Sequence, residues 1–455
     1  MDDELRELRA ALAGAGHPLY LGAGPRGAVH ARPQQAVLVL GPPRSGKTSS
    51  IVIPIVVSAA GLVVSTSTKT EVMEITAAAR AELGRVWLFD PSGTVPVPLG
   101  VRALRWSPVP GAASWDGALL LARCLVRASR PSTRVVDGGH WEERAEALLA
   151  PLLHAAAVSD ATASDVLRWV HRRNLGEARL VLDAGGADPG TAIAADVLAG
   201  LAATEERELS GIWSTAAGAL AAYRGAAALS AADRPNCDMA SLVESSDTVY
   251  ICASSRHQAL VAPLVVGFLE ELRAATYARL PGRPPVVLAL DEVANVAPLP
   301  DLPAVVSEGG GQGLVTLACL QDLSQARTRW GGAAEGFLSL FGTTVVLPGI
   351  GDLRTLEAVS VLSGEIDVPT VSATSPPWPA AGPPATVTVG TRRQRRVLPE
   401  QVAHAQAGTA WVLDGHHGAS RIVLTPWFAW APFRRLSPLT SRPRALSPPS
   451  EILER

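Results

Sequence analysis

Short runs of apolar residues recur along the chain and predict the strands of one sheet. Most runs are continuous rather than alternating, which is typical of parallel strands covered on both faces. Stretches with helical periodicity separate many of them, so the pattern favours a doubly wound α/β fold. The predicted strands are residues 36–40, 62–65, 86–89, 248–252, 286–290, 314–320 and 343–347.

The middle of the chain has a different pattern, rich in alanine and leucine. Apolar side chains there follow helical spacing on one face. An example is the set Trp141, Ala145, Leu148, Leu149 and Leu152. We interpret residues 111–239 as an all-α domain inserted into a sheet domain formed by residues 1–110 and 240–435.

Three further segments are interpreted from their composition. Residues 372–386 are rich in proline, alanine and serine, and predict an exposed loop. Residues 411–413 and 421–424 predict a closing hairpin. The final segment, 436–455, is proline-rich without periodicity and predicts a disordered tail. Residues 51–64 are almost wholly apolar, but they fall short of the roughly 20 residues that span a bilayer.

Composition narrows the class of protein without naming a function. Hydrophobic residues make up 47% of the chain and charged residues 18%, so it can bury a large core. The formal net charge is −2, so any contact with nucleic acid must come from local patches or a charged pore. The 4 cysteines lack the spacing of a zinc site, and the acidic start lacks a signal peptide, so a reducing cytoplasm fits.

Lysine occurs only as Lys47 and Lys69, whereas the other 38 of the 40 basic residues are arginine. Lys47 lies in a segment that fits the phosphate-loop pattern G-x-x-x-x-G-K-[ST] at every position. The segment joins a predicted strand to a predicted helix over residues 48–57, where backbone N–H groups and the helix dipole would hold phosphates. The predicted nucleotide-binding residues are Gly41, Pro42, Pro43, Arg44, Ser45, Gly46, Lys47, Thr48 and Ser49.

The expected ligands are ATP and Mg²⁺. Lys47 would contact the β- and γ-phosphates, and the Thr48 hydroxyl would bind Mg²⁺. A second apolar strand ends in Asp291 and Glu292. Asp291 would support the Mg²⁺, and Glu292 would act as general base toward water. Gln321 ends the following strand, where its amide could contact the γ-phosphate or the attacking water.

These residues resemble those of the type IV secretion coupling proteins, the TraG/TraD-like conjugative DNA-transfer ATPases related to the FtsK/HerA motors. The matching motifs run along nearly the whole chain in the family order. They include Arg44-Ser45-Gly46-Lys47, Lys69-Thr70-Glu71, Trp141-Glu142-Glu143-Arg144-Ala145, Leu290-Asp291-Glu292, Gln312-Gly313-Leu314, Leu320-Gln321-Asp322, Gly351-Asp352-Leu353-Arg354 and Leu398-Pro399-Glu400.

The resemblance implies a RecA-like P-loop ATPase with a central, mostly parallel sheet and an inserted all-α domain. It implies a homo-hexamer around a pore that feeds single- or double-stranded DNA, or a relaxase–DNA complex, to the components of a type IV secretion channel. An arginine of one subunit would then complete the ATP site of the next. Arg354 is the first candidate for that role, with Arg327 and Arg256 as alternatives. Lys69 is expected near the nucleotide or the subunit interface.

The chain departs from the family pattern in three respects, one of which is that it is not basic overall. The family usually begins with membrane-spanning helices, and none is predicted here. We therefore expect a cytoplasmic protein, or one peripheral at the inner face of the cell membrane, whose membrane contact comes through another subunit or a missing segment. The family motif Asp-Pro-Lys-Gly-Glu is replaced by Ser67-Thr68-Lys69-Thr70-Glu71.

Two alternative functions stay open at this point. One is a related hexameric ATPase that recruits protein substrates without moving DNA, and the other is a nucleotide-dependent scaffold with little turnover. The intact pair of motifs argues against the scaffold. The cluster Arg392-Arg393-Gln394-Arg395-Arg396 could contact phosphates or form a solvated charged turn.

Overall fold

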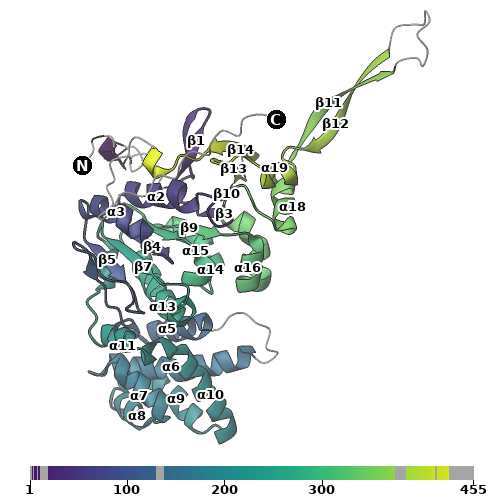
Figure 1. Cartoon of the computed structure of the whole chain (residues 1–455). Coiled ribbons are helices and arrows are strands. Elements are labelled where there is room, and N and C mark those ends of the chain that lie inside the picture. The colour runs from purple at the N-terminus through teal and green to yellow at the C-terminus, as the bar shows by residue number, and fades with distance from the viewer. Residues whose placement is uncertain are drawn as a thin grey trace, which may run out of the picture.

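A computed structural model describes residues 3, 5–7, 9, 10, 19–129, 138–374, 386–415 and 418–429. These residues form a twelve-stranded sheet with helices on both faces and a separate two-stranded ribbon (Figure 1). None of the helices within the described residues is both long and apolar enough to cross a bilayer. The predicted disordered tail, residues 436–455, lies outside the described residues.

The sheet has a parallel core and an antiparallel edge. Its strand order is β2-β1-β14-β13-β10-β3-β9-β8-β4-β7-β5-β6. Pairing is parallel from β10 to β6 and antiparallel from β10 to β2. The parallel strands are β3 (Val37–Leu40), β4 (Val63–Ser67), β5 (Val86–Phe89), β6 (Arg102–Ala103), β7 (Thr248–Cys252), β8 (Val286–Leu290), β9 (Leu314–Leu320) and β10 (Thr343–Val346). The predicted α/β class and its mostly parallel sheet are confirmed.

Continuous apolar strands occur because the sheet separates two cores. Val37 and Val39 of β3 enter one core, and Leu38 and Leu40 enter the other. The first core is closed by α2 (Ile53–Ser58) and α3 (Glu71–Ala81). The second is closed by α13 (Gln258–Tyr277), α14 (Val293–Val296) and α15 (Leu302–Glu308). Neither face of the parallel strands therefore needs polar side chains.

A helical region lies between β6 and β7 in sequence and occupies one end of the molecule (Figure 1). Its core is continuous with that beneath α13, and α5 contacts α13 directly. The division of the chain into domains at residues 111 and 239 therefore stays a prediction. The helices are α4 (Pro108–Gly111), α5 (Trp115–Ala128), α6 (Gly138–Ala157), α7 (Ala163–Arg172), α8 (Gly176–Ala184), α9 (Pro189–Ala202), α10 (Glu206–Ala219), α11 (Ala226–Asp233) and α12 (Met239–Val243).

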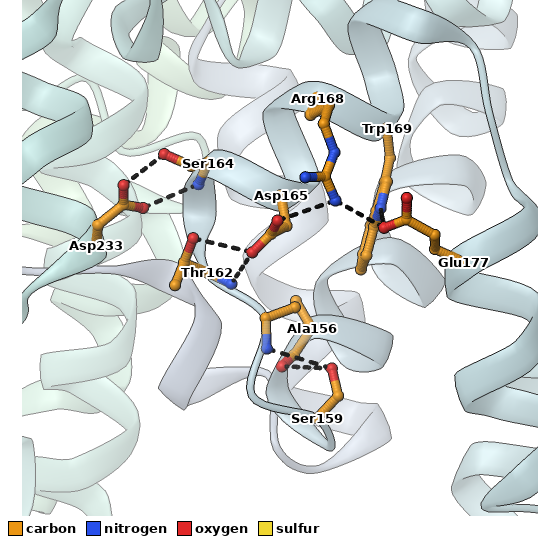
Figure 2. A network of polar contacts seen from close by, with 10 residues as sticks. Ala156, Ser159, Thr162, Ser164, Asp165, Arg168, Trp169, Glu177 and Asp233 are labelled. Carbon is orange, nitrogen blue, oxygen red and sulfur yellow. Dashed lines mark hydrogen bonds and ion pairs between the residues drawn. The ribbon is translucent and has the colours of Figure 1, made fainter.

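Polar contacts fix α7 against its neighbours in the helical region (Figure 2). Asp165 accepts hydrogen bonds from the Thr162 N–H at 2.8 Å and the Thr162 hydroxyl at 3.1 Å, which caps the start of α7. Asp233, at the end of α11, accepts from the N–H of Ser164 at 2.9 Å. Glu177 of α8 accepts from the indole N–H of Trp169 at 2.8 Å. The start of α7 is thus tied to α11, and its middle to α8.

The structure contains strands that the sequence analysis missed. β11 (Glu365–Thr374) and β12 (Thr386–Arg395) form an antiparallel ribbon that projects from the body (Figure 1). The predicted loop at 372–386 is therefore wrong at both ends, and Arg392–Arg395 lies in a strand rather than a turn. The alternating Thr and Val of residues 386–389 favour a strand, and the prolines nearby obscured that signal. Residues 375–385 lie outside the described part.

At the antiparallel edge, strands from the early and the late parts of the chain pair with each other. The predicted hairpin is confirmed as β13 (Thr409–Asp414) and β14 (Gly418–Val423). β1 (Tyr20–Gly24) and β2 (Gly27–His30) were not predicted, and β1 pairs with β14. Further α-helices of this half are α16 (Leu323–Trp330), α17 (Phe337–Leu340), α18 (Leu353–Leu362) and α19 (Pro399–Ala403).

One buried arginine ties α3 to the amino ends of β4 and β7. Arg80 is fully buried, and burial lowers its pKa to about 10, so it is still cationic at neutral pH. It donates to Thr248 Oγ1 at 2.6 Å and to the carbonyl oxygens of Ala59, Gly61 at 2.8 Å and Ser246 at 3.1 Å. These acceptors come from two separate segments, the ones that lead into β4 and β7, so one side chain satisfies what would otherwise be unpaired buried oxygens.

We predict that Arg80→Met lowers the free energy of unfolding by about 3–5 kcal/mol, because it leaves several buried acceptors without a donor. Arg105→Met is the matched control, since Arg105 is exposed, and it should change the free energy by less than about 0.5 kcal/mol. Urea unfolding followed by circular dichroism measures both. Equal stability of the two variants would contradict this account of Arg80.

Candidate functional site

The predicted chemistry gathers at one edge of the sheet. The phosphate loop follows β3, Gln321 follows β9, and Asp291 follows β8. Because β3, β9 and β8 are neighbouring parallel strands, all three segments leave the sheet at its carboxyl edge. The loop begins in register with β9, since the Gly41 N–H donates to the Leu320 carbonyl at 3.1 Å.

The loop is folded tightly enough to require glycine at its start. A Cβ atom on Gly41 would lie 2.7 Å from Ser45 Oγ and 2.9 Å from Leu347 Cβ. Arg44 and Gly46 have φ values of 64° and 97°, so the chain passes twice through the left-handed region. Such alternation turns successive N–H groups toward one concave side, which is the geometry of an anion-binding nest.

Lys47 is held inside the loop by main-chain oxygens. Its ammonium donates to the carbonyl oxygen of Gly41 and, at 2.9 Å, to that of Pro42. Ser45 Oγ is buried in the same loop without a hydrogen-bond partner. A cation bound to neutral carbonyls and an unpaired hydroxyl beside it are groups that phosphate oxygens would satisfy. The loop residues therefore fit a phosphorylated ligand.

Thr48 and Asp291 are in direct contact, although 243 positions separate them in the chain. Thr48 Oγ1 donates to Asp291 Oδ2 at 2.9 Å. Asp291 is 7% exposed, and burial raises the pKa of its carboxyl, while the Thr48 hydrogen bond and the charge of Lys47 act in the opposite direction. A divalent cation at these two oxygens would favour the ionised carboxylate.

The oxygen atoms of this pair fit Mg²⁺ in combination with a nucleotide. Within the described ranges, no group of three or more His, Cys, Asp or Glu side chains could hold a metal ion. Mg²⁺ commonly binds through one or two protein oxygens together with phosphate oxygens and water. Thr48 Oγ1 and the Asp291 carboxylate are therefore the residues that would hold it.

Glu292 follows Asp291 in an unusual backbone conformation. Its φ and ψ are 54° and 48°, which is the left-handed region, and its side chain is half-buried. The conformation ends β8 sharply and starts α14. The sequence analysis did not select Thr66 of β4, whose hydroxyl donates to the main-chain carbonyl of Asp291 at 3.0 Å. A threonine in an apolar strand has no sequence signal that separates this contact from ordinary strand preference.

The other predicted site residues lie farther along the same edge. Gln321 is exposed beside the loop, and its N–H donates to Gln325 Oε1 at 3.0 Å. Lys69 is exposed beyond the end of β4, the strand next to β8. Among the described residues, no hydrogen bond or ion pair joins Lys69 to the phosphate loop. Its predicted role stays a prediction.

The three candidate arginines differ in their surroundings. Arg354 is exposed in the first turn of α18, and Arg256 is exposed beyond the end of β7. Arg327 of α16 instead forms an ion pair with Asp352 at 2.8 Å. Of the three, Arg354 and Arg256 thus present exposed side chains that a second subunit could meet.

The family description "Type IV secretory system Conjugative DNA transfer" matches residues 10–376. The chain belongs to this family. The match spans the phosphate loop, the helical region, the acidic strand and Arg354, so the resemblance drawn from the motifs is confirmed. The chain is a conjugative coupling protein that links DNA transfer to type IV secretion. No curated protein matches the chain significantly.

Solved structures confirm the RecA-type fold of this coupling protein. The unbound form of the bacterial conjugative coupling protein TrwBdeltaN70 has a TM-score of 0.68 and 17% sequence identity, with 92% of each chain covered. The plasmid coupling protein TrwB in complex with ADP and Mg²⁺ has a TM-score of 0.65 and 17% identity, with 86% of each chain covered. At this identity the likeness shows the fold alone.

We predict that Lys47→Ala weakens nucleotide binding by roughly 10- to 100-fold, because a charge-assisted hydrogen bond to phosphate contributes about 1.5–3 kcal/mol. Titration calorimetry with ADP and Mg²⁺ measures the affinity. The thermal midpoint without nucleotide serves as the control for folding, and it should change little because Lys47 pairs only with loop carbonyls. Wild-type affinity in a folded variant would contradict this role of Lys47.

Proposed function

We propose that this coupling protein is a Mg²⁺-dependent ATPase with its site at the carboxyl edge of β3 and β8. The observation that carries the proposal is the 2.9 Å contact between Thr48 Oγ1 and Asp291 Oδ2. It unites the phosphate loop and the acidic strand in one site. The complex of TrwB with ADP and Mg²⁺, and the complex with the non-hydrolysable ATP analogue ADPNP, support the choice of ligand.

Each residue of the site has a defined task in hydrolysis. Lys47 exchanges its carbonyl contacts for the β- and γ-phosphates and offsets their charge. Thr48 and Asp291 would hold Mg²⁺, which would supply charge stabilisation at the phosphates. Glu292 accepts a proton from the water that attacks the γ-phosphate. Gln321, on the neighbouring strand end, hydrogen-bonds that water or the phosphate without adding charge.

We further propose that hydrolysis drives DNA, or a relaxase–DNA complex, toward the type IV secretion channel. Family membership supports this substrate. A homo-hexamer would let Arg354 of one subunit reach the site of the next, and its exposure on α18 leaves it accessible. The protein would act in the cytoplasm, at the inner face of the membrane. Its contact with the membrane would come through another subunit or a segment outside this sequence.

A second candidate function is protein-substrate recruitment without DNA movement. The charge of the ribbon favours it. Arg393 pairs with Glu365 at 2.7 Å, and Arg395 pairs with Glu357 at 2.7 Å, so two arginines of the basic cluster are already neutralised. The net charge of −2 adds no general attraction toward DNA phosphates.

We predict that Glu292→Gln lowers the rate of ATP hydrolysis by about 100-fold or more, because general-base catalysis typically contributes that much. The variant should still bind ATP, since the amide keeps the shape of the side chain. Phosphate-release kinetics give the rate, and Glu308→Gln at the exposed end of α15 is the control. If both variants turn over like the wild type, Glu292 is not the base.

We predict that single- or double-stranded DNA raises ATP hydrolysis at least about twofold at low salt, and that added salt weakens the effect, because phosphate contacts release counterions. An acidic polypeptide of similar charge is the control for simple polyanion effects. An enzyme that hydrolyses ATP equally with and without DNA would favour the protein-substrate function instead.

A further inference from the structure

Thr66 is a buried threonine in the middle of the sheet whose hydroxyl has a specific acceptor. It lies in β4 with no exposed surface. Its Oγ1 donates to the main-chain carbonyl of Asp291, just beyond the end of the neighbouring strand β8, at 3.0 Å. A side chain in a parallel strand ordinarily packs against a helix, so a bond to the next strand's backbone calls for an explanation.

The strand ladders around β8 end just before this carbonyl. The last aligned residues are Thr66 with Leu290 on one side and Leu290 with Ala318 on the other. Beyond them the Asp291 N–H turns back to the Ala289 carbonyl at 3.2 Å, and Glu292 enters the left-handed region. A non-glycine residue held there is strained, so surrounding contacts must hold the turn in place.

Two hydroxyls fix Asp291, one from the helical turn that follows the phosphate loop and one from β4. Thr48 Oγ1 binds its side chain at 2.9 Å, and Thr66 Oγ1 binds its main chain at 3.0 Å. The Asp291 carbonyl and the Glu292 N–H belong to one planar peptide unit. Holding that carbonyl therefore restricts ψ of Asp291 and φ of Glu292, the two angles that aim both carboxylates.

We propose that Thr66 is a positioning residue for ATP hydrolysis, which orients Asp291 and Glu292 through the peptide that joins them. The inference rests on the proposed ATPase function. Thr66 acts only through these two residues, so its loss should slow the chemical step and leave nucleotide affinity nearly intact. A displacement of about 1 Å at a reacting group is enough to slow catalysis on the order of 100-fold.

The same sheet supplies a matched control. Thr316 lies in β9, on the other side of β8, and is 1% exposed. Its Oγ1 is buried and has no hydrogen-bond partner. Thr66→Val and Thr316→Val make the same chemical change on the two strands that flank β8, but only the first removes a bond to the site. Thr66→Ser restores the hydroxyl alone.

The test compares kcat, KM for ATP and amide hydrogen exchange across residues 288–296 in the full chain. Thr66→Val should lower kcat by about 10-fold or more with KM within about threefold, and exchange at Glu292 and Val293 should rise. Thr66→Ser and Thr316→Val should stay near wild type in all three. If Thr66→Val fails to fold, Thr66→Ala replaces it, since alanine also lacks the hydroxyl.

The outcomes separate this inference from the proposed function. Equal kcat and exchange for Thr66→Val and Thr316→Val would overturn the positioning role, as would a Thr66→Ser variant as slow as Thr66→Val. If the wild type does not hydrolyse ATP, the proposed function fails. Exchange then decides on its own, and only a rise confined to the Thr66→Val variant would support the role of Thr66 in holding the turn.

Discussion

The hydrogen bond between Thr48 and Asp291 is the contact on which the site depends. It joins the start of the phosphate-loop helix to the end of β8, across the intervening strand β9. The contact is possible because β3, β9 and β8 are parallel and end at the same edge. An antiparallel β9 would not by itself prevent it, but an antiparallel β8 would place Asp291 at the far edge. The parallel direction of the strands is therefore the condition for the contact between the Thr48 and Asp291 side chains.

Burial on both faces gives this edge its electrostatic character. The two cores leave water little access to Asp291, and the same burial raises the pKa of its carboxyl. Because water does not solvate the ionised form of Asp291 well, a bound cation would stabilise that carboxylate more than solvent does. The Lys47 ammonium donates hydrogen bonds to carbonyl oxygens of its own loop. Nucleotide binding would exchange internal contacts for phosphate contacts, with little rearrangement of the sheet itself.

The sequence predicts the parallel strands well because both of their faces are buried. β7, β8 and β9 begin and end at the predicted residues, since an uninterrupted apolar run leaves few alternatives. The contact between Thr48 and Asp291 follows from the same logic, because both residues lie at the carboxyl edge of parallel strands. The β11–β12 ribbon was missed because its strands are exposed and carry threonine, arginine and proline, so no buried face marks them.

Side-chain partners within the site are harder to predict than the site itself. Thr66 looks like any strand threonine until the backbone turn at Asp291 and Glu292 is known. The same limit applies to the arginines. The sequence offers Arg354 first, with Arg327 and Arg256 as alternatives, and only the fold reveals that Arg327 is paired with Asp352. Contacts between segments far apart in the chain depend on register, which composition and motif spacing do not encode.

A crystal structure of this protein with a non-hydrolysable ATP analogue and Mg²⁺ tests the central claim most directly. We predict that Lys47 Nζ leaves the carbonyl oxygens of Gly41 and Pro42 for the phosphates. Thr48 Oγ1 and the Asp291 carboxylate should face the same Mg²⁺, with Glu292 directed at a water near the γ-phosphate. A nucleotide bound elsewhere, or bound with Lys47 still on its own loop and no Mg²⁺ beside Asp291, would contradict the account.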